Sequence, residues 1–215
     1  MPILYKGLFM SRSTPSRTKA PRSKNGKNNH LRIIAGKWRG RKVSFPDSHG
    51  LRPTSDRVRE TLFNWLAPII NNAHCLDLFS GSGALSLEAL SRGAAAATLI
   101  DSSKAVSEQL RQNLKQLECN AANVQVKDAI MWLKEGNAEK NSFDLVFVDP
   151  PFKQQLVTPC CELLEQHGWV KEGGYIYIET EINLLLQLPS NWHIHREKQA
   201  GQVAYYLCIK ETANN

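Results

Sequence analysis

The chain has 215 residues, of which 42% are hydrophobic and 22% are charged, a composition typical of one soluble globular domain. No apolar run approaches the roughly 20 residues that a membrane-spanning helix requires, which argues against a membrane protein and favours the cytoplasm. The net charge of +7 is uneven, because residues 1–60 contain 15 Lys or Arg and only three acids. A basic end on an acidic body indicates a polyanionic partner that binds from the amino-terminal side.

The composition of the amino-terminal residues predicts two segments before the main domain. Residues 1–30 are rich in Ser, Lys, Arg, Asn and Pro and contain no acid, which is typical of a disordered basic arm. Residues 31–51 contain two short β-like runs, at 31–35 and 41–45, separated by a segment with two glycines. This pattern predicts a β-hairpin extension with cations crowded around its turn.

The main domain is expected over residues 52–211. It opens with a helix inside residues 52–68, for which Thr54, Ser55 or Asp56 can serve as N-cap. Strands and helices then alternate, with strands expected at 75–79, 96–100, 124–126 and 143–148 and helices at 84–91, around 106–117 and at 129–134. Such alternation predicts an α/β fold with a parallel sheet and right-handed crossovers. Two late runs, 175–179 and 201–209, add further strands, the last in a closing hairpin.

The first junction between strand and helix predicts a ligand-binding turn. Gly81 and Gly83 allow the backbone to turn sharply and to approach a ligand closely. The dinucleotide fingerprint would need a third glycine where Ser86 stands, and Asp77 at the strand end would repel a pyrophosphate. Both observations argue against NAD and favour a nucleoside ligand without phosphates that carries an ammonium group.

Two further aspartates strengthen this interpretation. Asp101 ends the second strand, 20 residues beyond Gly81, where an acid typically accepts hydrogen bonds from ribose hydroxyls. Asp128 ends the third strand and can bind an adenine amino group. Each could be a solvated loop residue by itself, but acids at three successive strand ends beside a glycine turn fit S-adenosylmethionine, with its adenine, unphosphorylated ribose and ammonium.

The fourth strand ends in "DPPF", residues 149–152, which is unusual for a connector. Proline cannot donate to a sheet ladder, so Pro150 and Pro151 end the strand and stiffen the turn. The motif resembles that of methyltransferases that modify exocyclic amines. Asp149 and the Pro150 carbonyl can accept the two hydrogens of such an amine, and Phe152 can stack on a base that has left its helix.

The five cysteines favour reduced thiols. They are odd in number and lack Cys-x-x-Cys spacing, so neither a disulfide framework nor a metal site is expected. A Pro-Cys pair at 159–160 raises the alternative of a cysteine nucleophile, as in cytosine C5 methyltransferases. Its place in the next predicted helix favours buried structural cysteines instead.

Five stretches together are similar to one family over about residues 31–210. They are "RIIAGKWRGRKV", "GLRPTSDRVRETLFNWLAP", "LDLFSGSGALSLEALSRGA", "VFVDPPF" and "HREKQAGQVAYYL". The chain resembles the bacterial 16S ribosomal RNA guanine-N2 methyltransferases of family D. The resemblance implies a class I Rossmann-like methyltransferase, with a seven-stranded, mostly parallel sheet whose last strand is antiparallel. It implies methylation of the guanine numbered 966, within the assembled or assembling small ribosomal subunit. We also expect a monomer that binds no metal.

The resemblance and the patterns described above together give expected roles for individual residues. Asp149 and Pro150 are the expected catalytic residues. The residues expected to bind S-adenosylmethionine are Asp77, Phe79, Gly81, Gly83, Asp101, Ser102, Asp128, Ala129 and Arg57. Those expected to bind RNA are Pro151, Phe152, Lys37, Trp38, Arg39, Arg41 and Lys42. For the hairpin, the alternative is that Trp38 packs inside the protein and the cations are merely solvated.

Two other functions remain open from the sequence. One is a DNA amino-methyltransferase acting on adenine N6 or cytosine N4, although no DNA target-recognition domain is evident. The other is a non-catalytic RNA-binding protein on a methyltransferase scaffold, against which the intact aspartates and "DPPF" argue.

Overall fold

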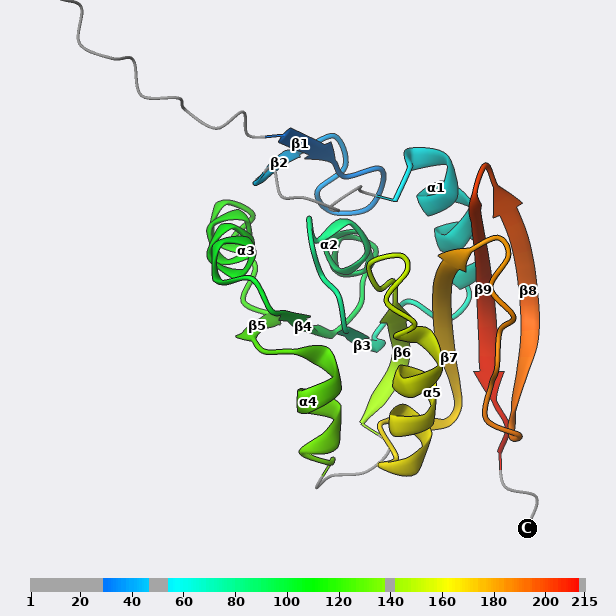
Figure 1. The fold of residues 1–215 in the computed structure, drawn as a ribbon. Helices are drawn as coiled ribbons and strands as arrows, with labels where there is room; N and C mark the ends of the chain where they lie inside the picture. Colours follow the sequence, from blue (N-terminus) through cyan, green and yellow to red (C-terminus); the bar gives the residue numbers. More distant parts are fainter. Residues whose placement is uncertain (1–28, 47–53, 138–141, 213–215) are drawn as a thin grey trace, which may run out of the picture.

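The computed structural model describes residues 29–46, 54–137 and 142–212 (Figure 1). Nearly all of the expected basic arm, 1–30, therefore lies outside the described residues. The strands are β1 (Asn29–Arg32), β2 (Lys42–Phe45), β3 (His74–Asp77), β4 (Ala96–Asp101), β5 (Ala122–Val126), β6 (Phe143–Val148), β7 (Val170–Glu181), β8 (Trp192–Ala200) and β9 (Val203–Lys210). The helices are α1 (Asp56–Leu66), α2 (Ala84–Ser91), α3 (Lys104–Gln116), α4 (Ala129–Lys134) and α5 (Val157–Gln166). No helix among these residues is long and apolar enough to cross a membrane.

Seven strands form one sheet in the order β5-β4-β3-β6-β7-β9-β8. The first five are parallel to one another, whereas β9 runs antiparallel to both of its neighbours. This confirms the predicted sheet and its closing hairpin. Apolar side chains alternate between the two faces of the strands, so the core divides into a cluster that includes α1, α2 and α3 and another that includes α4 and α5. Figure 1 shows the two helix layers on either side of the sheet.

The predicted hairpin is present, with strands β1 and β2 paired antiparallel. Its strands are shorter than expected because residues 33–41 form a compact loop that docks on α2. Glu88 of α2 accepts hydrogen bonds from the backbone N–H groups of Ile34, at 2.8 Å, and of Ala35, at 3.0 Å. Gly36 packs so closely that a Cβ there would lie 1.8 Å from the carbonyl oxygen of Ser91, and its φ is +78°. Only glycine fits this contact.

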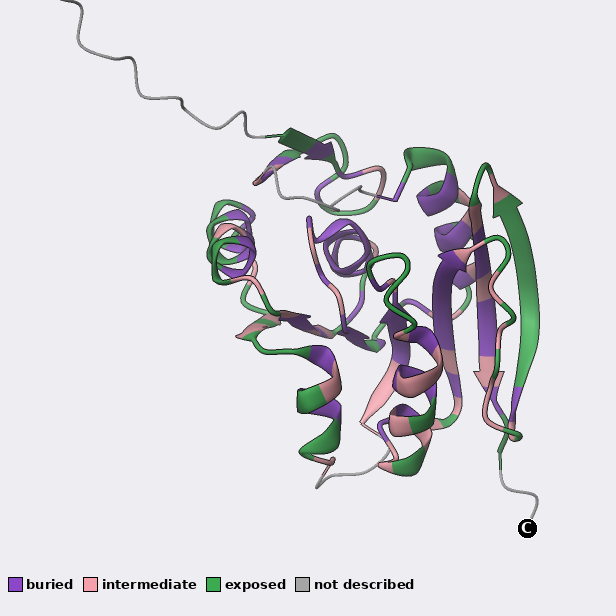
Figure 2. Ribbon diagram, in the orientation of Figure 1, coloured by how far each residue is buried: buried purple, intermediate pink, exposed green. Residues whose placement is uncertain are grey.

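All eight residues of α2 are buried, including its polar residues Ser86, Glu88 and Ser91 (Figure 2). The hairpin explains this, because it covers the helix face that the sheet leaves open. Glu88 also pairs with Arg92, Nε to Oε1 2.7 Å, and lies 3.6 Å from Nη1 of the fully buried Arg59. Arg59 in turn donates to the carbonyl of Arg32 at 3.0 Å. Buried charges that are paired and hydrogen-bonded in this way fix the hairpin on the main domain.

Candidate active site

The predicted aspartates gather at the carboxyl ends of neighbouring parallel strands. Asp77 is the last residue of β3, Asp101 is the last of β4, and Asp149 directly follows β6. Asp77 is paired with Phe147 in the β3–β6 register, so Asp77 and Asp149 face the same side of the sheet. In an open α/β sheet ligands bind at this edge.

Asp77 is 2% exposed, and burial raises its pKa to about 7. The hydroxyl of Ser86 donates to its Oδ2 at 2.5 Å, which partly offsets the effect of burial. The backbone N–H groups of Phe79 and Ser86 also lower the pKa, but neither lies at hydrogen-bonding distance and angle to the other oxygen, the buried Oδ1, which has no donor among the described residues. A buried carboxylate oxygen without a donor fits an ammonium group on a ligand.

The glycine turn is built as expected. Gly83 adopts a left-handed conformation, φ +78°, and is the N-cap of α2. Gly81, with φ +48°, donates its N–H to Asp101 Oδ2 at 2.9 Å. Ser103 N donates to Asp101 Oδ1 at 2.8 Å. Burial raises the pKa of Asp101, against the effect of these two hydrogen bonds. Each carboxylate oxygen still has a lone pair for a ribose hydroxyl.

The remaining predicted cofactor residues lie around this edge, but they differ in exposure. Asp128 is exposed and caps α4, accepting from Met131 N at 2.9 Å, and Ala129 behind it is buried. Ser102 is exposed directly after Asp101, and Phe79 is partly buried beside the turn. Arg57 is exposed in the first turn of α1. Its role stays a prediction.

Asp149 belongs to a second group of polar side chains. Thr54 Oγ1, immediately before α1, donates to Asp149 Oδ2 at 3.2 Å. Glu179 of β7 is 7% exposed and accepts from the Tyr177 hydroxyl at 2.8 Å. Burial first, then the charges of Glu179 and Asp77, raise the pKa of Asp149 well above its ordinary value. Burial also raises the pKa of Glu179.

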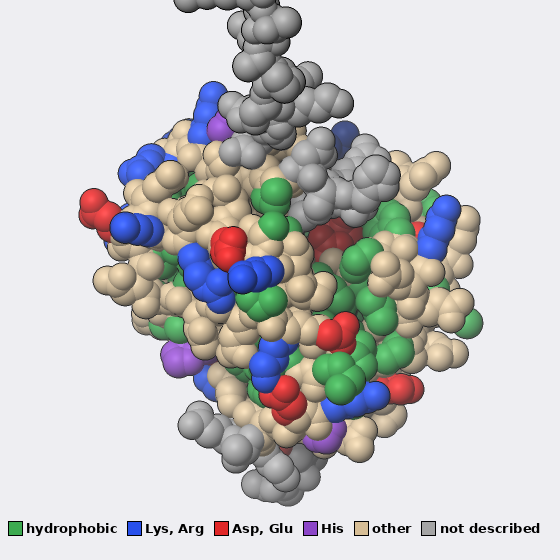
Figure 3. Space-filling model, turned by 60° about the vertical axis from the view of Figure 1, so that its left-hand side comes forward, with side chains coloured by type: hydrophobic (Ala, Val, Ile, Leu, Met, Phe, Trp, Pro, Cys, Tyr) green, Lys and Arg blue, Asp and Glu red, His purple; other side chains and the backbone are tan. Residues whose placement is uncertain are grey.

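The "DPPF" turn leaves its aromatic side chain accessible. Pro150 is buried and Pro151 exposed, while 42% of Phe152 is exposed. Lys153 and Gln155 have φ of +64° and +53°, and Lys153 N donates to Glu181. A small hollow lies between this turn and the end of β7, with Pro150, Phe152 and Glu179 among its lining residues. Figure 3 shows acidic side chains at the bottom of a hollow bordered by hydrophobic ones.

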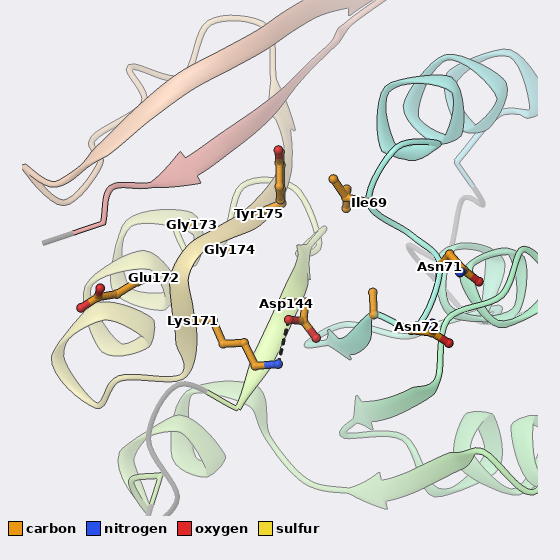
Figure 4. A pocket seen from close by; sticks show the side chains of 10 residues that line it. Ile69, Asn71, Asn72, Asp144, Lys171, Glu172, Gly173, Gly174 and Tyr175 are labelled. Atoms are coloured by element: carbon orange, nitrogen blue, oxygen red, sulfur yellow. Dashed lines mark hydrogen bonds and ion pairs between the residues drawn. The ribbon is translucent and has the colours of Figure 1, made fainter.

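A larger cavity, about 220 Å³, lies at the opposite end of the strands (Figure 4). Asn71, Asn72, Gly173 and Gly174 are among its lining residues. Lys171 Nζ and Asp144 Oδ1 are paired there at 2.7 Å. The Asp144 carboxylate is therefore already paired, and the cavity lies at the amino ends of β3 and β6. This cavity is not the site that the sequence predicts.

The hairpin corrects one expectation. Trp38 is only 6% exposed and belongs to the hydrophobic core, so it cannot stack on RNA in this structure. Its backbone N–H donates to Ser91 Oγ at 2.9 Å, which holds Trp38 against the end of α2. Arg41 donates to the carbonyl of Gln116 at 2.8 Å, at the end of α3. The side chains of Lys37, Arg39, Arg41 and Lys42 are exposed.

Sequence reasoning missed Thr54 and Glu179 as members of the site. Glu179 nevertheless carries the signal that identified the aspartates, an acid near the carboxyl end of a β-strand. The cysteines behave as expected: Cys160 and Cys161 are buried in α5 without a disulfide, and burial raises the pKa of Cys160 to about 12. No group of three potential metal ligands occurs among the described residues.

The residues at the strand ends fit S-adenosylmethionine. The unpaired oxygen of Asp77 suits its ammonium, and Asp101 has lone pairs for the ribose hydroxyls. With the sheet order and the "DPPF" turn, these features define a class I S-adenosylmethionine-dependent methyltransferase. A family model described as "Conserved hypothetical protein 95" matches residues 31–209, and the chain belongs to that family.

Known proteins similar to this chain agree with the class. The "Ribosomal RNA small subunit methyltransferase D" of Escherichia coli (strain K12) is 55% identical over 182 residues, which cover 84% of this chain and 90% of that protein. The solved structure of a putative methyltransferase from Escherichia coli has a TM-score of 0.77 and 53% identity, covering 85% of this chain and 99% of that one. A Thermus thermophilus 16S rRNA N2 G1207 methyltransferase, solved with AdoMet and guanosine, has a TM-score of 0.61 at 16% identity, covering 86% and 50%, and shows the fold alone.

Proposed function

We propose that this protein methylates the exocyclic N2 amine of guanine 966 in the 16S rRNA of the small ribosomal subunit. One observation carries the proposal: Asp149 of "DPPF" stands at the same sheet edge as Asp77, whose Oδ1 has no donor among the described residues. The relatives named as small-subunit rRNA methyltransferases support the substrate.

The arrangement suits an amine that is a poor nucleophile. Its lone pair is delocalised into the ring, and the cofactor supplies an electrophilic methyl group on a sulfonium. The Asp149 carboxylate accepts one N–H of the amine, and the carbonyl of Pro150 accepts the other. These bonds favour a pyramidal nitrogen whose lone pair points at the methyl group. The stiff turn fixes both acceptors beforehand, so they stabilise the transition state without reorganisation.

Two further features support an RNA substrate. Phe152 is 42% exposed beside the amine acceptors, where it can stack on a base that has left its helix. Lys37, Arg39 and Lys42 are exposed on the hairpin and can contact phosphates. We expect a cytoplasmic monomer that binds the assembled or assembling subunit and needs no metal.

The test is transfer of a labelled methyl group to small subunits that lack the modification, followed by mass spectrometry of the nucleosides. N2-methylguanosine at position 966 is the expected product. Asp149→Ala should lower the transfer rate by about 10²-fold while S-adenosylmethionine affinity stays nearly unchanged. Asp144→Ala is the matched control, because Asp144 lies at the start of β6, whereas Asp149 directly follows the end of this strand. Transfer by Asp149→Ala within a few-fold of wild type would contradict the proposal.

A further inference from the structure

Glu179 lies beside Asp149 at the same level of the sheet. Val148 of β6 pairs with Ile178 of β7 in a parallel register, and Asp149 and Glu179 are the residues that directly follow this pair along the chain. Their side chains share one face, because Phe147 and Tyr177, two residues earlier, both pack in the cluster with α1 and α2. An ionisable group therefore stands next to the amine acceptor without a role in the chemistry described so far.

Two hydroxyl groups orient this pair of carboxyl groups. Tyr177 donates to Glu179 Oε2 at 2.8 Å and holds that side chain from behind. Thr54 donates to Asp149 Oδ2 at 3.2 Å and is also within hydrogen-bonding reach of Glu179. A hydroxyl has one hydrogen to donate, so when Thr54 donates to Asp149, Glu179 keeps acceptor capacity for a ligand.

The Watson–Crick edge of guanine presents two adjacent donors, N1–H and the N2 amine. A base whose N2 amine is bound at Asp149 brings N1–H to the neighbouring position. We infer that Glu179 accepts the N1–H of the target guanine and is a specificity-determining residue of the site. The inference rests on the proposed function. It explains why an acid stands in a buried position where burial opposes its charge.

The inference predicts which bases are accepted. In 2,6-diaminopurine the N2 amine is retained, but N1 is an acceptor and would face the Glu179 carboxylate with two lone pairs opposed. Wild-type protein should therefore prefer guanine at the target position. Glu179→Gln offers an amide N–H that can donate to N1 of the analogue. This single change should reduce the preference for guanine by at least about 10-fold, since a site built for a hydrogen bond rejects an analogue that leaves it unpaired.

The experiment uses small subunits reconstituted on RNA with either guanine or 2,6-diaminopurine at the target position. The kcat/KM ratio for the two substrates is measured on one preparation of each protein, so the ratio does not depend on the fraction of active protein. Glu197→Gln, on the exposed strand β8, is the matched control and should keep the wild-type ratio. Tyr177→Phe should lower the ratio less than Glu179→Gln, because it removes only the group that holds Glu179.

The outcomes separate the inference from the proposed function. A lowered ratio in Glu179→Gln, with the control unchanged, supports the inference. An unchanged ratio would overturn it. If both substrates lose activity equally, Glu179 has a merely structural role, and if neither loses activity, Asp149 binds both donors. If wild-type protein fails to methylate guanine-containing subunits, the proposed function itself fails.

Discussion

Replacing Asp77 with Asn should make the unliganded protein more stable while it abolishes tight cofactor binding. The carboxylate of Asp77 is buried beside Ser86, and one of its oxygens lacks a donor among the described residues. An ionised group in this position lowers the stability of the fold. The Asn side chain has nearly the same shape, carries no charge, and can still accept the hydrogen bond from Ser86.

The size of the effect follows from the pKa. Burial raises the pKa of Asp77 from 3.8 to about 7, and each unit corresponds to about 1.4 kcal/mol. A carboxyl group with a raised folded-state pKa stabilises the fold below its unfolded pKa, and this stability is lost as the pH rises through the folded pKa. The wild-type protein should therefore lose about 4 kcal/mol relative to Asp77→Asn between about pH 4 and about pH 8.

Urea unfolding of both proteins across this pH range measures the difference, and calorimetric titration measures S-adenosylmethionine affinity. We expect the variant's advantage to grow with pH and its cofactor affinity to fall by at least about 10²-fold, because the ammonium loses its charged partner. A stability difference that does not change with pH would refute the reasoning, since Asp77 would then not be ionised at the cost of stability.

Two predictions concern the hairpin. Gly36→Ala should destabilise the protein by about 2–4 kcal/mol in urea unfolding, because its Cβ would meet the Ser91 carbonyl. Gly40 has a similar φ of +81° but nothing within 4 Å of an added Cβ, so Gly40→Ala should cost only about 1–2 kcal/mol. Equal losses of stability in the two variants would mean that the contact with α2 is not decisive. Reversing the charges of Lys37, Arg39 and Lys42 should weaken binding to the small subunit and flatten its salt dependence, measured by titration at several salt concentrations, without changing cofactor affinity. An unchanged salt dependence of binding would mean that the RNA-binding surface lies elsewhere on the protein.

The regular elements and the aspartates could be predicted from the sequence because their signals are local. Helices α2 and α4 and strand β6 have the predicted bounds, since apolar periodicity and flanking glycine, aspartate or proline define their ends. Ser55 is the N-cap of α1, one of three candidates. Asp77, Asp101 and Asp149 could be found because parallel strands end at one edge of the sheet.

The contacts between the hairpin and α2 could not be predicted, because they join residues more than 50 positions apart. Glu88 and Ser91 look like ordinary helix positions until the backbone of residues 34–38 is placed on them. Trp38 was assigned to RNA because cations surround it in the sequence. The same turn places its ring in the core while the cations stay outside. Local composition indicated the charged surface but not which side the aromatic ring would face.

The electrostatics of the site imply that the protein holds its ligands at a cost to its own stability. Asp77, Asp149 and Glu179 all have raised pKa values, with burial as the main cause in each. No ion pair joins any of the three to a cation among the described residues, whereas the fully buried Glu88 is paired with Arg92 and Arg59. Glu88 therefore holds the hairpin on α2, whereas we expect the three site carboxylates to gain charged or N–H partners only from a bound ligand. We propose that the ammonium of the cofactor and the N–H donors of guanine pair with these carboxylates. Binding of both ligands should then stabilise the protein most at high pH, where these carboxylates are ionised.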